Sequence, residues 1–204
     1  MPASFPGLLL ASTSPHRRAL LERLRIPFTI EAPAVDETQE PGETPAVLAA
    51  RLAVMKARAV AGRHAGEALL VIGSDQVAEL DGMAIGKPGD AETNIHQLQQ
   101  ASGRTLTFHT GLCVCAAGDA RCEVVVETFR VRLRELDDSA IRHYVFTERP
   151  FDAAGGFYSE GLGIALFEHF EGRDPNTLVG LPLMALVDLL ARFDFRVLDA
   201  AARG

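Results

Sequence analysis

The segment that precedes the first predicted helix combines hydroxyl and cationic side chains. Ser12 and Ser14 follow a short apolar run, Pro15 takes the first helical position, and Arg17 and Arg18 fall in the first turn. Free backbone amides at a helix N-terminus attract anions, whereas cations there oppose the helix dipole. Two arginines at this end therefore suggest an anion between them. Two interpretations are open from this segment alone: a phosphate site of Ser12, Ser14 and Arg17, or a capped surface helix with solvated arginines.

Carboxylates occur at two places where they could hold a divalent cation. Glu37 lies in an acidic loop predicted over residues 32–43, and Asp75 follows an apolar strand predicted over 68–72. A carboxylate at the carboxyl end of a buried strand can meet a ligand in the crevice of the sheet. Its hard oxygens suit Mg²⁺ or Mn²⁺, which usually also bind substrate phosphates. The alternatives are a turn-capping role for Asp75 and a solvated loop around Glu37.

Two lysines complete this set of charges. Lys56 is predicted on the helix after the acidic loop, and Lys87 stands between Gly86 and Pro88, where limited backbone freedom could aim the cation. A lone lysine is usually at the surface, but the combination of serines, cations and acids is one that binds phosphate and metal. The histidines are not spaced as metal ligands, and no Ser/His/Asp or Cys/His arrangement is evident.

Strands and helices that could position these residues alternate along the chain, which is typical of an α/β or α+β protein with a mixed sheet. Ser14 and Thr44 each precede a proline, a pattern that predicts a helix start. Asp81-Gly82 and Gly118-Asp119 predict hairpin turns. The predicted strands cover 7–11, 28–31, 68–72, 104–117, 121–133 and 164–167, and the predicted helices cover 15–25, 45–63, 90–102, 137–147 and 182–193.

Length and charge limit the possible classes of protein. A chain of 204 residues with 48% hydrophobic and 23% charged residues suits one domain over 1–204, or two lobes that share a cleft. Gly103 and the region 150–156 are the best candidates for lobe edges. The net charge of −7 gives no sign of nucleic-acid or membrane binding, so a polyanionic substrate needs a local cluster of cations. We find no signal peptide and no apolar run of roughly 20 residues, and we expect a cytoplasmic protein.

Three cysteines, Cys113, Cys115 and Cys122, lie within ten residues. Their spacing fits no zinc motif, and an odd number argues against a disulfide framework. We expect buried thiols on neighbouring strands in a reducing compartment.

Five short motifs occur in order along the chain, and together they resemble the Maf family from about residue 8 to 190. One such motif would be a weak signal, whereas five in register are specific. The resemblance implies an α/β, mixed-sheet Maf/ITPase-like fold, elongated and two-lobed around a central cleft, and a homodimer. It implies a nucleoside triphosphate pyrophosphatase that needs a divalent cation (Mg²⁺, Mn²⁺ or Co²⁺) and releases a nucleoside monophosphate and pyrophosphate. The motifs are STSPHRR at 12–18, VDE at 35–37, GSDQ at 73–76, GKP at 86–88 and NTLVGLPL at 176–183.

The resemblance also implies roles for single residues. Asp75 matches the catalytic acidic residue, the proposed base for water, and Glu37 shares the metal with it. Whether Asp75 takes the proton or mainly holds the metal is open at this stage. Ser14 joins the phosphate-binding residues through its place at the helix start. The positions that match phosphate-binding residues of the family are Ser12, Arg17, Lys56 and Lys87.

Within the family, Gln76 and Glu160 resemble the branch that acts on 7-methyl-GTP, because the branch that acts on dTTP and UTP has Thr and Gln there. The stretch 167–176 agrees with the same branch. His16 departs from it, since that position is aromatic in the 7-methyl-GTP branch and arginine in the other. We predict that His16, Gln76 and Glu160 set the specificity and that 7-methyl-GTP is the substrate.

Two alternatives to 7-methyl-GTP hydrolysis are carried forward. One is the same reaction on dTTP, UTP or an unmethylated purine nucleotide. The other belongs to a different class, a septum-associated regulatory protein that binds partners without turnover. The complete polar set argues against this second alternative, since a pure binder has no need of Asp75, Lys56 and Lys87 together.

Overall fold

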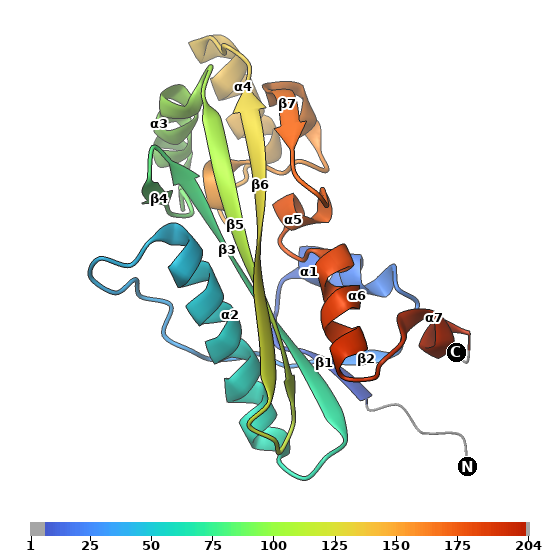
Figure 1. The fold of residues 1–204 in the computed structure, drawn as a ribbon. Coiled ribbons are helices and arrows are strands. Elements are labelled where there is room, and N and C mark those ends of the chain that lie inside the picture. The colour runs from blue at the N-terminus through green and yellow to red at the C-terminus, as the bar shows by residue number, and fades with distance from the viewer. Residues whose placement is uncertain (1–6, 203–204) are drawn as a thin grey trace.

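The computed structural model describes residues 7–202, which form one seven-stranded mixed sheet with helices on both faces (Figure 1). The strand order is β2-β1-β3-β5-β6-β7, with β4 paired to β3. Strand β1 runs parallel to β2 and β3, and the other pairs are antiparallel. The predicted mixed-sheet α/β class is therefore confirmed. The strands are β1 Gly7–Leu10, β2 Phe28–Ile30, β3 Leu69–Leu80, β4 Met83–Ile85, β5 Thr105–Ala116, β6 Cys122–Leu133 and β7 Phe167–Glu171.

The helices begin where the capping signals predict. Ser14, Thr44, Asp90 and Asp137 each accept a backbone N–H from three residues later. The first helix is shorter than predicted and ends at Glu22. Arg25, the predicted last residue, has a left-handed backbone conformation with φ 54°, which does not continue an α-helix. The helices are α1 Pro15–Glu22, α2 Pro45–Ala61, α3 Ala91–Ala101, α4 Asp138–Glu148, α5 Asn176–Val179, α6 Leu183–Arg192 and α7 Val197–Ala201, with 3₁₀ turns η1 Gly62–His64, η2 Ala154–Gly156 and η3 Leu162–Leu166.

In residues 7–202, we find no helix with the length and apolar character that a membrane span requires.

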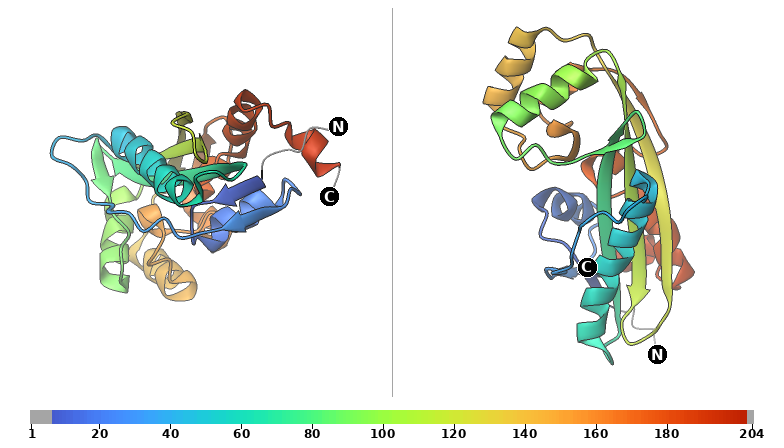
Figure 2. Two further views of the ribbon diagram at one scale, coloured as in Figure 1. Left: turned by 90° about the horizontal axis from the view of Figure 1, so that it is seen from below. Right: turned by 90° about the vertical axis from the view of Figure 1, so that its left-hand side faces the viewer.

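Alternate residues of the long strands pack against different helices, because successive side chains of a strand point to opposite faces. Ile72 of β3 and Leu112 of β5 pack with α1 and α6, whereas Val71 and Cys113 pack with α2. Further along the hairpin, Phe108 belongs to a separate core with α3 and α4. Figure 2 shows α3 and α4 beside one end of the long strands, and β1, β2 and α1 beside the other half.

Helix α2 lies very close to the sheet because two glycines face it. A Cβ atom at Gly73 would lie 2.3 Å from the carbonyl oxygen of Ala53, and one at Gly111 would lie 2.1 Å from that of Ala49. Ala49, Ala53 and Ala57 recur every four residues and so form one stripe of small side chains along the helix. The contact of this stripe with the glycines sets the distance between α2 and the middle of β3.

Two of the strand predictions are wrong in extent. The strand predicted over 68–72 continues to Leu80 as β3, because β5 pairs with it along almost its whole length despite its polar middle. The strand predicted over 164–167 is instead the 3₁₀ turn η3, and the strand β7 starts only at Phe167, where pairing with β6 begins. In both cases, pairing with a neighbouring strand outweighs the local pattern of the sequence. Helices α5 and α7 were not predicted.

The prediction of three buried thiols is also wrong. Cys115 and Cys122 form a disulfide, and only Cys113 is a free, buried thiol. The two paired cysteines lie directly opposite each other in the register of β5 and β6. The predicted turn at Gly118-Asp119 already implied this register. An odd number of cysteines excludes complete pairing but leaves one pair possible.

Candidate active site

A cleft of about 540 Å³ opens where the parallel pairing of the sheet stops. Strand β1 pairs with β3 only as far as Leu10 and Ile72, and β3 continues past this point. The β1–α1 loop, the loop 32–37, the middle of β3 and the segment 152–160 all contribute to the walls. The edge beyond the end of parallel strands is where open α/β sheets bind their ligands, and the volume is that of a small-molecule site.

All ten residues predicted to act in a site line this one cleft. Serines, arginine, lysines, carboxylates and the specificity residues come together from six different parts of the chain. Their assembly in one cleft was not implied by any single motif. They are Ser12, Ser14, His16, Arg17, Glu37, Lys56, Asp75, Gln76, Lys87 and Glu160.

The most buried charges of the cleft centre on Lys56. Its Nζ lies 2.6 Å from Asp75 Oδ1 and 2.7 Å from Glu37 Oε1. The side chains of Lys56 and Asp75 are 7% and 10% exposed, whereas that of Glu37 is 54% exposed. Asp75 lies in the middle of β3 and not after its end, as the sequence had suggested. It faces α2 because it shares the sheet face of Gly73, and the close approach of α2 brings Lys56 into contact with it.

Electrostatic interactions favour the charged forms of Glu37 and Arg17. Partial burial raises the pKa of Glu37, but the hydrogen bond from Lys56 and the attraction of Lys56, Lys87 and Arg17 outweigh it, so this pKa lies below its usual value. Burial lowers the pKa of Arg17, and attraction to Asp75 and Glu37 opposes that effect. An arginine remains protonated at neutral pH. Glu37 is therefore a carboxylate that lies among cations.

The carboxylates of this cluster fit a divalent cation. Lys56 contacts one oxygen of each, and neither Glu37 Oε2 nor Asp75 Oδ2 accepts a hydrogen bond from the described part of the chain. Both residues line the same cleft. Mg²⁺ and similar ions usually take one or two carboxylates together with substrate phosphates and water. The donor set is therefore suitable for Mg²⁺, Mn²⁺ or Co²⁺ with a phosphate ligand, and the metal itself stays a prediction.

The start of α1 is held rigidly at the edge of the cleft. Ser14 Oγ caps the helix by accepting the N–H of Arg17, and Ser12 Oγ accepts the N–H of Ser14. The guanidinium Nε of Arg17 donates to Gly180 O at 2.9 Å, which ties α1 to the turn after α5. Arg18, in contrast, is exposed and pairs with Glu22 on the same helix. Of the two arginines, only Arg17 lines the cleft.

Gln76 connects β3 to α5. Its Nε2 donates to Thr177 O at 2.7 Å and to Leu178 O at 3.1 Å, and it lies 3.2 Å from Thr110 Oγ1. These contacts occupy the amide nitrogen. The carbonyl oxygen Oε1 accepts no hydrogen bond from residues 7–202 and is the polar atom that a ligand in the cleft can meet.

A second group of side chains that line the cleft combines a stacked ring pair and a carboxylate. The rings of His16 and Tyr158 are stacked, with centroids 5.2 Å apart and an angle of 23° between their planes. His16 Nδ1 lies 2.8 Å from Glu160 Oε1. The side chains of His16 and Glu160 are 37% and 41% exposed, so both are open to a ligand.

Tyr158 and Asp152 were not among the site residues predicted from the sequence. The Tyr158 hydroxyl donates to Asp152 Oδ1, and its backbone N–H donates to the hydroxyl of Tyr144 on α4. Burial and the neighbouring Asp152 raise the pKa of Tyr158 to about 12, so the hydroxyl stays protonated. Tyr158 stands two residues before Glu160, and this proximity was the available signal. We find no signal in the sequence that points to Asp152.

The sequence profile of the family described as Maf-like protein matches residues 7–193. This chain belongs to the Maf-like family. The match includes all ten predicted site residues, each of which lines the cleft.

Three relatives of this Maf-like chain share one description. The chain is 51% identical over 196 residues to the 7-methyl-GTP pyrophosphatase of Paraburkholderia xenovorans, and the alignment covers 96% of each protein. The 7-methyl-GTP pyrophosphatase of Pseudomonas aeruginosa is 51% identical over 91% of this chain and 95% of the relative. That of Pseudomonas syringae pv. tomato is 49% identical over 92% and 96%. Among solved structures, that of the Staphylococcus aureus Ham1 protein aligns with a TM-score of 0.44 and 18% identity over 63% of this chain and 72% of that one.

Proposed function

We propose that this chain hydrolyses a nucleoside triphosphate, 7-methyl-GTP in preference to others, to the nucleoside monophosphate and pyrophosphate. One observation carries the proposal: a single cleft is lined both by a buried cluster of cations and carboxylates and by a stacked ring pair with a carboxylate. The first group, called the phosphate end below, suits the phosphates of a nucleotide, and the second, called the base end, suits its base. The relatives named 7-methyl-GTP pyrophosphatase support the choice of substrate.

At the phosphate end, Asp75 positions the attacking water and takes its proton. Its contact with Lys56 holds the carboxylate in place. Lys56, Lys87 and Arg17 balance the negative charge that develops on the phosphates as the bond between the α- and β-phosphates breaks. A divalent cation bound by Glu37 and Asp75 would add charge neutralisation for the leaving pyrophosphate. Positioning and electrostatics provide most of the rate in such transfers.

At the base end, Glu160 reads the edge of the purine. Guanine presents an N1–H and an exocyclic amine side by side, and one carboxylate can accept both. Methylation at N7 gives the ring system a positive charge, which makes this edge a better donor. The His16–Tyr158 pair offers a flat surface to the same ring, since aromatic faces attract cations. A pyrimidine with a carbonyl at this edge would be repelled by Glu160.

A nucleotide panel tests the proposal. The kcat/KM values for 7-methyl-GTP, GTP, dTTP and UTP are compared, with pyrophosphate detected as phosphate after added inorganic pyrophosphatase. We expect the highest value for 7-methyl-GTP. Faster turnover of dTTP or UTP would assign the chain to the other substrate class. No turnover of any nucleotide would favour the alternative of a regulatory protein that binds partners without turnover.

Hydrolysis in ¹⁸O-water identifies the bond that breaks. Attack on the α-phosphorus places the label in the monophosphate. Label found only in pyrophosphate or orthophosphate would contradict the mechanism.

We propose in addition that the enzyme requires Mg²⁺, Mn²⁺ or Co²⁺, works as a homodimer and acts in the cytoplasm. The carboxylate pair supports the metal, and the family resemblance supports the dimer. Removal of metal with a chelator should abolish turnover, and each ion is then added back in turn. Light scattering on the purified chain measures the oligomeric state, and cell fractionation locates the protein.

A further inference from the structure

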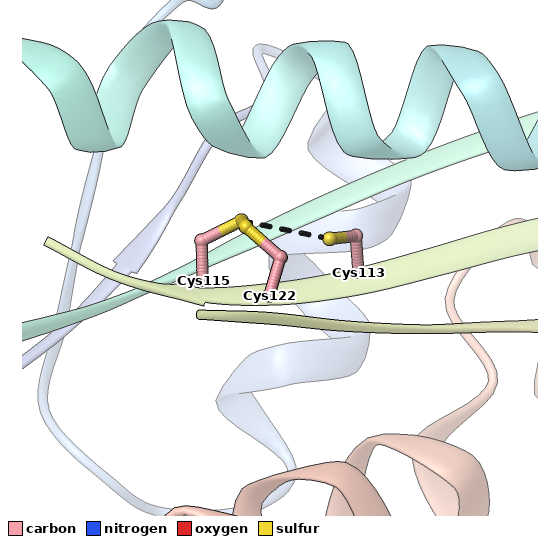
Figure 3. Close-up of side chains that lie close together, drawn as sticks. All are labelled: Cys113, Cys115 and Cys122. Carbon is pink, nitrogen blue, oxygen red and sulfur yellow. Dashed lines mark hydrogen bonds between the residues drawn. A yellow bond between two sulfur atoms is a disulfide. The ribbon is translucent and has the colours of Figure 1, made fainter. Parts of the chain in front are cut away.

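The three cysteines lie together at the end of the β5–β6 hairpin, outside the residues that line the cleft. Cys113 and Cys115 point to the same face of β5 because they are two residues apart, and Cys122 faces them from β6. All three Sγ atoms lie within 4.8 Å of one another. Figure 3 shows the group beneath α2, with the Cys113 sulfur 3.6 Å from that of Cys115.

The surroundings of this group are apolar. Cys113 and Cys115 are fully buried among Val71, Ala57 and Val60, and Cys122 is half-buried near the hairpin end. Within the described residues 7–202, no histidine or carboxylate has a ligand atom inside the same 4.8 Å group. Any ion bound here would therefore have sulfur ligands only.

We propose that Cys113, Cys115 and Cys122, when all three are reduced, form a binding site for a monovalent soft cation, Cu(I). Soft thiolates select such ions over hard ones. Structural zinc sites are almost always four-coordinate, and this group offers three protein ligands.

The Cys115–Cys122 disulfide makes two of the three sulfur atoms unavailable as thiolate ligands. Opening it consumes two electrons and two protons, which an external dithiol supplies as it becomes a disulfide itself. Cys122, as the half-buried member, is the sulfur that such a reductant can reach. The thiols then pass protons to solvent as the ion binds, because thiolates and not thiols are the ligands.

The test is anaerobic titration of the full chain with Cu(I) against a chromophoric Cu(I) chelator. Native mass spectrometry gives the stoichiometry. We expect one Cu(I) per reduced chain and an affinity at least about tenfold lower for the oxidised chain, which has the same sequence and needs no mutation. Loss of an outer partner of a metal ligand costs about 10–100-fold in affinity, so loss of a ligand costs at least about tenfold. Cys113→Ser and Cys122→Ser should each show such a loss.

Ala116→Ser is the matched control, because it adds a hydroxyl to the same strand and removes no thiol. Its affinity should equal that of the parent. Equal affinity of the parent and Cys113→Ser would reduce the site to two ordinary thiols and overturn the proposal. So would tighter binding of Zn²⁺ than of Cu(I) in competition, or equal uptake by the oxidised and reduced chains. None of these outcomes depends on nucleotide hydrolysis, so the proposed function is tested separately.

Discussion

The proposed phosphate end and base end of the cleft are built in different ways. The phosphate end consists of side chains from a helix and the middle of a central strand, where Lys56 and Asp75 are almost completely buried. The base end consists of side chains from the first turn of α1 and from an irregular segment, and His16 and Glu160 are more than a third exposed. A charge pair is much stronger away from water than at the surface. The difference suggests that the phosphate end supports the chemistry of every substrate and that the base end selects among them.

The largest expected effect is that of Asp75→Asn. Asparagine keeps the size and can still accept a hydrogen bond from Lys56, but it removes the charge and any base. Turnover should fall at least about a hundredfold on every nucleotide, the scale of a lost acid–base or charge-stabilising group. Thermal stability should stay close to that of the parent or increase.

Glu79→Gln on the same strand is a suitable control for Asp75→Asn, because Glu79 pairs with His109 and does not line the cleft. Its turnover should be near that of the parent. If Asp75→Asn unfolds, or turns over near the normal rate, Asp75 has a structural role and the assignment of the phosphate end is wrong.

Glu160→Gln tests whether the base end acts selectively. Hydrogen bonds to charged groups contribute about 1.5–3 kcal/mol, so kcat/KM for 7-methyl-GTP should fall roughly ten- to a hundredfold. The kcat/KM for GTP should be less affected, and the values for UTP and dTTP should stay the same or increase. Glu168→Gln, on the exposed strand β7, is the matched control. Equal losses on all four nucleotides would mean that Glu160 serves phosphate, metal or fold.

Gly111→Ala tests whether the phosphate end depends on the close contact of α2 with the sheet. The added methyl group would collide with the backbone of Ala49, so we expect a loss of about 1–3 kcal/mol in the free energy of unfolding. Gly62→Ala at the end of α2 has open space and an ordinary helical φ, and it should be neutral or stabilising by up to about 1 kcal/mol. Denaturant unfolding measures both. Equal stabilities would show that α2 can shift without cost.

The smallest effect concerns the loop that carries Glu37. At its base, His64 bonds Glu31 and Glu67, and these hydrogen bonds raise the pKa of His64 above 6.5. Because the folded pKa is raised, this stabilisation is present below pH 6.5 and is lost as pH rises through the folded value. The pKa of Glu31 is lowered by His64 and Arg63, so its share is lost as pH falls through its own folded value.

His64→Gln should therefore flatten the pH dependence of the melting temperature above pH 6.5 and leave turnover almost unchanged. The groups are exposed, so the change should be small. An unchanged slope of melting temperature against pH would show that the His64 pairing adds nothing to the stability of this loop.

Much of the local structure could be predicted from sequence because its causes are local. A hydroxyl or carboxylate before a proline or a helical run specifies a helix start, and a Gly-Asp turn between alternating segments specifies a hairpin. Those signals placed Ser14, Thr44 and the β5–β6 hairpin correctly. The motifs and the family resemblance also indicated ten polar residues, all of which line the cleft.

Other features depend on contacts between distant segments, and only the tertiary structure decided them. Asp75 lies within a strand because β5 pairs along β3, and Lys56 meets it because Gly73 and Gly111 admit α2. Tyr158 joins the site by stacking on the ring of His16, which lies far earlier in the chain. Residue types and local order determine which groups are available for chemistry. Strand pairing and close packing determine which of them meet, because those contacts join residues that no local pattern connects.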